Sequence, residues 1–165
     1  AGGYFVGGPI VESFERDFAD YLGVAHVIGV ANGLDALRLA LEAHDIGAGD
    51  EVVVPAFTYY ATWLAVAQIG AVPVPVDVER ETGNIDPLLV RSAITPKTRA
   101  IIAVSLFGQA ARLNELRSTA DEAGLVLIED CAQSHGAMYQ SRMSGTVGHA
   151  SGFSFYPTKN LGALG

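Results

Sequence analysis

Apolar positions follow two repeating patterns along this chain. Short runs that are apolar at nearly every position alternate with longer stretches in which apolar residues recur every three or four positions. The first pattern is typical of strands buried on both faces, and the second of amphipathic helices. The first pattern predicts strands at residues 25–30, 51–55, 72–78, 99–106 and 125–129. The second predicts helices at 11–22, 58–69 and 112–123, with further helices after Gly33 and Pro87.

Strands that alternate with helices indicate right-handed βα units. The predicted fold class is therefore α/β, a mostly parallel or mixed sheet with helices on both faces. Pro73 and Pro75 cannot donate to a sheet ladder, so the strand at 72–78 is expected at an edge or a bulge. Gly23 and Gly124 are expected to end the helices that precede them.

The helix predicted at residues 58–69 is apolar around nearly its whole circumference. Tyr59, Tyr60 and Trp63 lie among its aliphatic residues, and we expect Trp63 in the core. One sheet face cannot cover so much apolar surface, so a second subunit or domain is expected to pack on this helix.

Composition narrows the classes of protein. Of the residues 50% are hydrophobic and 17% charged, and the formal net charge is -8. This acidic balance argues against nucleic acid or an anionic membrane as partner, since both are bound mainly through Lys and Arg. Cys131 cannot form an internal disulfide and is expected to be a small buried residue in a reducing compartment. Without a membrane-length apolar run or a metal-ligand spacing, we expect a soluble cytoplasmic protein with no bound metal.

The turn at residues 31–33 leads from an apolar run into a helix. A glycine at such a turn, followed by the free amides of a first helical turn, is typical of an anion site. The backbone N–H groups of Gly33, Leu34 and Asp35 are therefore candidates to hold a phosphate. The alternative is an ordinary turn in which Asn32 caps the helix. The pattern is not G-x-G-x-x-G, which counts against a dinucleotide-binding fold.

Lys159 stands in an uncharged stretch of aromatic, glycine and proline residues. Surroundings of low polarity favour a neutral amine, which can form a Schiff base with a carbonyl. The alternative is a solvated surface charge, as most lysines are. Asp130 ends an apolar run, where a buried parallel strand delivers ligand-contacting groups. A carboxylate that keeps a pyridine nitrogen protonated and a lysine that holds an aldehyde together indicate pyridoxal phosphate.

Six short motifs cover most of the chain. They are residues 8–9, 31–37, 49–52, 58–62, 129–136 and 153–160. In this order and spacing they resemble the DegT/DnrJ/EryC1/StrS sugar aminotransferases, which belong to the fold-type I pyridoxal phosphate enzymes. The resemblance implies that residues 1–165 are part of the large, cofactor-binding domain, and that a C-terminal small domain is not present in this sequence. Ser105 and Phe107 stand where the family more often has His and Tyr, so no polar role is carried over to them.

The resemblance also implies a role for each candidate site residue. Lys159 would form the Schiff base and act as the proton-transfer base, and Asp130 would keep the ring nitrogen protonated. Gln133 would hydrogen-bond the ring hydroxyl. Tyr59 would stack on the ring, with a core aromatic as the alternative. Ser154 would bind the phosphate, with a hydroxyl bonded to nearby backbone as the alternative.

The implied function is amino transfer to a nucleotide-linked keto-deoxysugar, with glutamate as the expected donor. The best match is a dTDP-linked 3-keto-6-deoxyhexose, in antibiotic or polysaccharide biosynthesis. The alternatives are a pyridoxal phosphate-dependent sugar dehydratase or lyase of the same fold and a catalytically silent regulatory relative. Both tend to replace the lysine, so Lys159 favours the aminotransferase. His135 is expected to be structural, and relatives that share each site between subunits imply a homodimer.

Overall fold

The computed structural model describes residues 7–163 of the chain. Its helices are α1 (Pro9–Leu22), α2 (Gly33–Glu42), α3 (Tyr60–Gln68), α4 (Pro87–Ala93) and α5 (Leu113–Ala123), with a short 3-10 helix, η1 (Leu106–Gly108). The strands of the main sheet are β1 (Glu51–Pro55), β2 (Val72–Val76), β3 (Thr98–Val104), β4 (Val126–Asp130) and β7 (Ala150–Gly152). Between β4 and β7, a small hairpin is formed by β5 (Met138–Tyr139) and β6 (Arg142–Met143).

The main sheet is parallel throughout, in the order β2-β1-β3-β4-β7. The α/β class predicted from the sequence is confirmed, and β2 lies at the edge where its two prolines were expected. The chain runs outward from β1 to β2 and then continues on the other side of β1 with β3. In open α/β sheets such a reversal of strand order leaves a crevice at the carboxyl ends of the strands.

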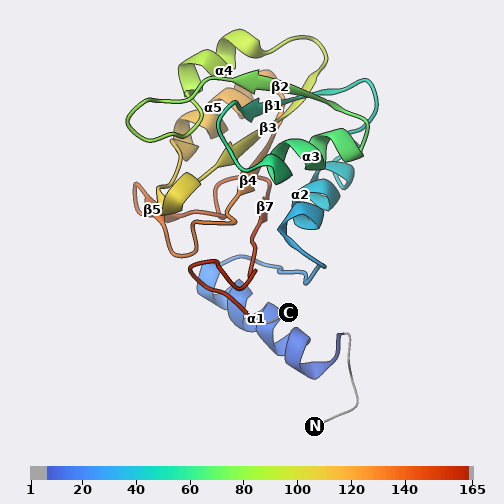
Figure 1. Cartoon of the computed structure of the whole chain (residues 1–165), viewed down its shortest axis with the longest axis vertical. Coiled ribbons are helices and arrows are strands. Elements are labelled where there is room, and N and C mark those ends of the chain that lie inside the picture. Colours follow the sequence, from blue (N-terminus) through green and yellow to red (C-terminus); the bar gives the residue numbers. More distant parts are fainter. Residues whose placement is uncertain (1–6, 164–165) are drawn as a thin grey trace.

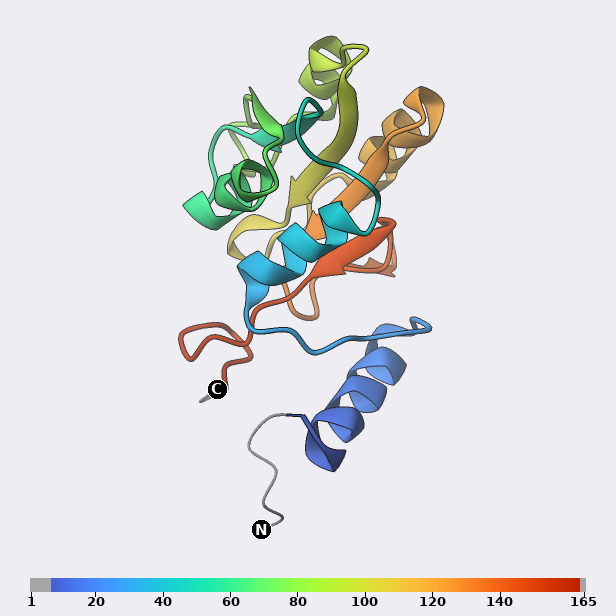
Figure 2. The same ribbon diagram turned by 90° about the vertical axis from the view of Figure 1, so that its right-hand side faces the viewer.

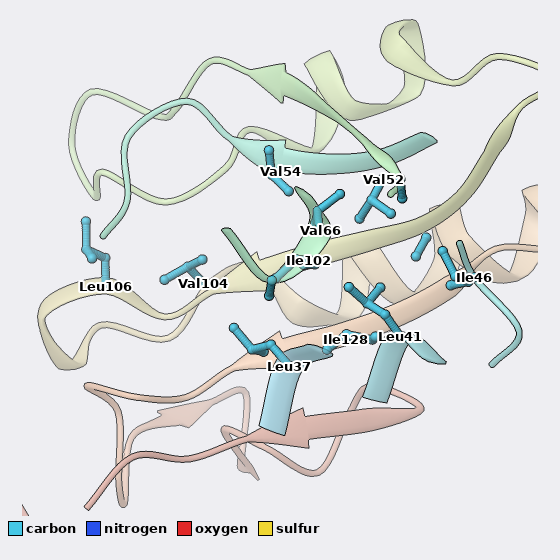
Figure 3. Close-up of a cluster of buried hydrophobic side chains, with 13 residues drawn as sticks. Leu37, Leu41, Ile46, Val52, Val54, Val66, Ile102, Val104, Leu106 and Ile128 are labelled. Atoms are coloured by element: carbon cyan, nitrogen blue, oxygen red, sulfur yellow. The ribbon is translucent and has the colours of Figure 1, made fainter. Parts of the chain in front are cut away.

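Helices cover both faces of the sheet (Figure 1). One core cluster lies under α2 and α3 and includes Leu37, Leu41, Val54, Val66, Ile102 and Ile128 (Figure 3). The other lies under α4 and α5 and includes Val53, Val90, Ile101, Leu116 and Leu127. Because successive strand residues point to opposite faces, Asp130 shares the first face with Ile128, and Glu129 shares the second with Leu127.

Helix ends follow the signals in the sequence. Gly23 and Gly124 adopt the left-handed conformation, with φ of 70° and 66°, and end α1 and α5 as predicted. Asp86 caps α4 by accepting a hydrogen bond from the Leu88 N–H at 2.8 Å. No helix within residues 7–163 combines the length and apolar character that a membrane span needs.

Helix α1 lies apart from the sheet and beside the segment that follows β7 (Figures 1 and 2). Its aromatic side chains contact that segment edge to face. The ring centroids of Phe14 and Phe155 are 5.0 Å apart, and those of Phe18 and Phe153 are 5.1 Å apart. The segment that leads to Lys159 therefore rests on α1 as well as on the sheet.

Two predicted elements differ in the structure. Residues 25–30 were predicted as a strand, but they pair with no strand among residues 7–163. They connect α1 to α2, and Ile28 is 78% exposed. Apolar character alone does not make a strand where no neighbouring strand is there to bond its backbone. The helix predicted from residue 58 begins at Tyr60, because Tyr59 has an extended backbone, so Thr58 and Tyr59 belong to the loop after β1.

Candidate active site

A cavity of about 730 Å³ opens at the carboxyl edge of the sheet. Its walls come from the start of α2, the loop between β1 and α3, the end of β3 and the segments that follow β4 and β7. The carboxyl ends of parallel strands meet at one edge, so residues distant in sequence come together here. The cavity is lined by all eight predicted site residues: Gly33, Leu34, Asp35, Tyr59, Asp130, Gln133, Ser154 and Lys159.

Asp130 is buried at the end of β4, with 7% of its surface exposed. Its Oδ2 accepts a hydrogen bond from the Thr62 hydroxyl at 2.8 Å, and its Oδ1 accepts one from the Ala132 N–H at 3.1 Å. Burial raises the pKa of Asp130 above its ordinary value, although these two bonds and the charge of Lys159 act in the opposite direction. A cation that entered the cavity beside Asp130 would offset this cost of burial.

Lys159 lies half-buried in the loop after β7. Its Nζ is 6.0 Å from the centre of the Tyr59 ring, within reach of a cation–π interaction. Its backbone N–H donates to the carbonyl of Tyr156 at 2.8 Å and closes a turn. Tyr59 itself is 57% exposed at the cavity and is not the core aromatic that the sequence left open as an alternative.

The loop of Lys159 is tied to the turn after β4 through the next residue, Asn160. The Asn160 Nδ2 donates to the His135 carbonyl at 3.2 Å, so its Oδ1, 2.9 Å from the His135 Nδ1, must accept. His135 therefore carries its proton on Nδ1. Its ring packs on Phe153 and Phe155, and burial is the main cause that lowers the pKa of His135. These contacts agree with the structural role predicted for it.

Gly33 and Ser154 meet at one end of the cavity. A Cβ at Gly33 would lie 2.9 Å from the Ser154 Cβ, so only glycine allows this approach. The N–H of Asp35 is bonded to the Asn32 Oδ1 at 2.9 Å, which makes Asn32 the helix cap. The N–H groups of Gly33 and Leu34 have no hydrogen-bond partner within residues 7–163. The cap therefore takes one of the three predicted amides and leaves two, beside a serine hydroxyl, for an anion.

Gln133 is oriented by a backbone contact that the sequence did not predict. The Phe107 N–H donates to its Oε1 at 2.9 Å, which leaves its Nε2 as the side-chain donor. Phe107 has φ 55° and ψ 21°, a left-handed conformation that costs a non-glycine residue about 1–2 kcal/mol. Asn84 holds both sides of this turn, accepting from the Leu106 N–H at 3.0 Å and donating to the Gln109 carbonyl at 3.0 Å.

Two threonines of the site carried no predicted role. Thr62 is fully buried and bonded to Asp130, and the Thr58 Oγ1 lies 3.0 Å from the Thr62 Oγ1. Their spacing of four residues at a helix start was a signal that both hydroxyls lie on one side. The carboxylate that Thr62 bonds, Asp130, is 68 residues further along the chain, and no local pattern indicates it.

Other reactive side chains lie away from the cavity. Cys131 is fully buried as predicted, its Sγ 3.3 Å from the Ser144 hydroxyl, and burial raises the pKa of its thiol. His149 accepts a hydrogen bond from the Leu127 N–H at 3.0 Å through its Nδ1. Residues 7–163 contain no group of three or more His, Cys, Asp or Glu that could hold a metal ion.

The parallel sheet, the strand-end carboxylate, the lysine and the helix N-terminus define an α/β protein with a candidate ligand cavity at the carboxyl edge of its sheet. The chain belongs to the DegT/DnrJ/EryC1/StrS aminotransferase family, whose family model matches residues 1–165. The family predicted from the six motifs is thereby confirmed.

Similar proteins agree with this assignment. The chain is 50% identical over 163 residues to a dTDP-3-amino-3,4,6-trideoxy-alpha-D-glucose transaminase of Streptomyces venezuelae, covering 99% of this chain and 43% of that protein. A crystal structure of S. venezuelae DesV in complex with a ketimine intermediate superposes with a TM-score of 0.96 at 50% identity, covering 99% of this chain and 44% of that one. The pyridoxal phosphate form of a putative sugar aminotransferase, Spr1654 of Streptococcus pneumoniae, gives a TM-score of 0.93 at 30% identity, covering 98% and 45%. The chain thus spans less than half the length of these relatives, and the predicted fold is confirmed.

Proposed function

We propose that this chain is the cofactor-binding part of a pyridoxal phosphate-dependent aminotransferase that acts on a nucleotide-linked keto-deoxysugar. One observation carries the proposal. A single cavity brings together a lysine amine, a strand-end carboxylate and a helix N-terminus beside a serine hydroxyl. These groups suit an aldehyde, a pyridine nitrogen and a phosphate, which are the three recognisable parts of this cofactor.

The cavity fits the cofactor in size and in donor set. Its volume of about 730 Å³ lies within the usual range of small-molecule sites. Gly33 leaves room for an anion beside Ser154, where a larger residue would clash. Asp130 is buried and makes no salt bridge within residues 7–163, so it is a suitable partner for a protonated ring nitrogen.

Bound in this cavity, pyridoxal phosphate would supply an aldehyde carbon and a protonated ring that withdraws electrons. The N–H groups of Gly33 and Leu34 and the Ser154 hydroxyl would hold the phosphate. The Gln133 Nε2 would donate to the ring oxygen, because its Oε1 is already bonded to backbone. The Lys159 amine would attach to the aldehyde and, once released, would move a proton to and from the substrate carbon that bears nitrogen.

The remaining site residues would set the ring's position and charge. Asp130 would keep a proton on the ring nitrogen, and Tyr59 would lie against the ring face. Tyr60 and Tyr156, 63% and 65% exposed, also line the cavity. Their flat faces are suited to the sugar and base of a nucleotide-linked substrate.

We propose a dTDP-linked 3-keto-6-deoxyhexose as the amino acceptor and glutamate as the donor. The identity to the S. venezuelae transaminase, whose name contains a dTDP-3-amino sugar, supports the acceptor. The test is an assay of the full-length protein with pyridoxal phosphate, glutamate, and dTDP-linked 3-keto or 4-keto sugars, followed by mass spectrometry. A 3-amino product is expected. A 4-amino product would overturn the substrate alone, and absence of any amino sugar would overturn the function.

We further propose that a second subunit completes the site. Phe57 and Phe107 are 53% and 74% exposed near the cavity, with ring centroids 6.3 Å apart. Exposed aromatic surface of this kind is typical of a protein interface. Light scattering of the full-length protein is expected to give a dimer, and a monomer with full activity would contradict the shared site.

Two other functions on the same fold are separated by the same assay. A sugar dehydratase or lyase would remove water or another group from the sugar and leave glutamate unchanged. A silent regulatory relative would change neither substrate. Lys159 favours the aminotransferase over both, because transamination needs a group that holds the aldehyde and then moves the proton.

A further inference from the structure

We infer that Thr62 is a positioning residue that holds Asp130 ionised and turned toward the cavity, with Thr58 as the second member of a two-hydroxyl chain. The inference rests on the proposed function, in which Asp130 meets the ring nitrogen of pyridoxal phosphate. Thr62 is fully buried in the first turn of α3, and its hydroxyl lies 2.8 Å from the Asp130 Oδ2. The Thr58 hydroxyl lies 3.0 Å from that of Thr62 and lines the cavity.

Which group donates in each hydrogen bond from Thr58 to Thr62 to Asp130 follows from counting protons. An ionised carboxylate has only acceptor sites, so the Thr62 hydroxyl must donate its one proton to Asp130. Its oxygen is then free to accept from the Thr58 hydroxyl. If Asp130 carried a proton on Oδ2 and donated it to the Thr62 oxygen, the bond between these two side chains would reverse. Because hydrogen bonds to a charged acceptor are the stronger ones, the chain favours the ionised carboxylate.

A second buried threonine shows the usual arrangement inside a helix. Thr119 in α5 is 3% exposed, and its hydroxyl donates to the Glu115 carbonyl, four residues earlier, at 3.0 Å. Helical threonines commonly bond in this way within their own helix. The Thr62 hydroxyl instead bonds two side chains that lie outside its helix, those of Thr58 and Asp130. The two threonines share their chemistry and burial, and only Thr62 touches the site.

Apart from Thr62, few groups lower the pKa of Asp130 against the effect of burial. The Ala132 N–H bonds its Oδ1, and Lys159 is the charged side chain that lowers its pKa among the residues described. On the proposed function, the Lys159 nitrogen would be linked to the cofactor, where it can be neutral or protonated, so its charge is not a fixed support for Asp130. Thr62 would then be the main side-chain contact that keeps Asp130 ionised, apart from the cofactor ring itself.

The test uses the full-length protein loaded with pyridoxal phosphate labelled with ¹⁵N in its ring. Thr62→Val removes the hydroxyl and nearly keeps the shape, Thr62→Ser keeps the hydroxyl, and Thr119→Val is the matched control. The ring ¹⁵N shift is recorded across pH to follow ring protonation, and cofactor affinity is measured by equilibrium dialysis.

In Thr62→Val the ring nitrogen is expected to lose its proton at lower pH than in wild type, and cofactor affinity to fall about tenfold to a hundredfold. Thr62→Ser is expected to restore both quantities largely, and Thr119→Val to leave them as in wild type. Thr58→Val, which removes only the outer hydroxyl, is expected to shift ring protonation less, in the same direction.

Equal ring shifts and affinities in Thr62→Val and Thr119→Val would overturn the inference. If Thr62→Val does not fold, Thr58→Val decides instead, and a wild-type ring shift in that variant would overturn the hydroxyl chain. Failure of the proposed function has a different signature, because wild-type protein would then take up no pyridoxal phosphate at all.

Discussion

Glu129 and Asp130, two adjacent carboxylates at the end of β4, have different surroundings. Glu129 is fully buried on the α5 face, and its two oxygens accept hydrogen bonds from the backbone N–H groups of Gly145, Val147 and Gly148 at 2.6–2.7 Å. Asp130 points to the opposite face, accepts only one backbone N–H and one hydroxyl, and borders the cavity.

The difference separates an acid that holds the fold from an acid available for chemistry. Three backbone donors satisfy Glu129 and fix the loop that leads into β7. Asp130 has fewer donors, so burial raises its pKa and a cation in the cavity would relieve it. Burial alone does not distinguish these two carboxylates, whereas the number and kind of their donors do.

Among substitutions at the cavity, Lys159→Ala should reduce activity the most. Without its amine, the protein is expected to form no covalent link to pyridoxal phosphate and to show no turnover, while its free energy of unfolding stays close to wild type. Borohydride reduction followed by mass spectrometry measures the link. Lys97→Ala, at an exposed lysine away from the cavity, is the control, and label retained in Lys159→Ala would disprove the assignment.

Asp130→Asn should slow amino transfer by at least a few orders of magnitude while cofactor still binds, because the ring nitrogen loses the partner that holds its proton. Stability should change in the opposite direction. A carboxylate whose folded pKa is raised favours folding only at low pH, and that contribution is lost as the pH rises through the folded pKa.

At pH 7 the apo form of Asp130→Asn should therefore be at least as stable as wild type. Urea unfolding of both apo proteins measures this, and steady-state kinetics measures the rate. A near-normal rate would make Asp130 only a strand-end residue, and a large loss of stability would place it with Glu129.

Glu129→Gln should mainly lower the free energy of unfolding. One acceptor becomes a donor that faces a backbone N–H, and charge-assisted bonds are lost, which costs about 1.5–3 kcal/mol in the free energy of unfolding. Urea unfolding measures the loss. Glu122→Gln is the control, since that exposed carboxylate pairs with Arg91 at the surface and should change stability by less than about 0.5 kcal/mol. A Glu129→Gln protein as stable as this control would remove the distinction between the two acids.

A smaller effect should appear with pH at His135, which lies in the turn after β4. Burial is the main cause that lowers its folded pKa, so the contribution of its neutral form is present above the unfolded pKa of about 6.5 and is lost as the pH falls. Unfolding measured between about pH 7.5 and 5 should show a flatter loss in His135→Asn than in wild type. Identical slopes would mean that His135 does not titrate with folding.

Much of the fold could be predicted because buried parallel strands and amphipathic helices have different apolar periods. Pro73 and Pro75 identified the edge strand, and Gly23 and Gly124 the helix ends. Residues 25–30 show the limit of this reasoning. A strand exists only beside another strand, and composition cannot say whether a partner lies next to it.

Asp130 and the amides at Gly33 could be predicted from a strand end and a turn, whereas Tyr59, Gln133 and Ser154 were expected only from the family resemblance. All of them line the cavity, although their roles in catalysis stay predictions. What could not be predicted were the groups that support them. Glu129 is bonded to amides 16 to 19 residues further along, and Thr62 to a carboxylate 68 residues away. The left-handed turn at Phe107 is likewise set by Asn84, which no pattern near Phe107 reveals.

The aromatic contact between α1 and the segment after β7 joins opposite ends of the described chain. Contacts between residues so distant in sequence close a long loop, and their entropy cost makes them slow to form. The sheet pairs strands that lie nearer in the sequence and should form before Phe14 and Phe18 meet Phe155 and Phe153. The segment that carries Lys159 should therefore gain its support late, so the completed site is expected to be among the last features to appear when the protein folds.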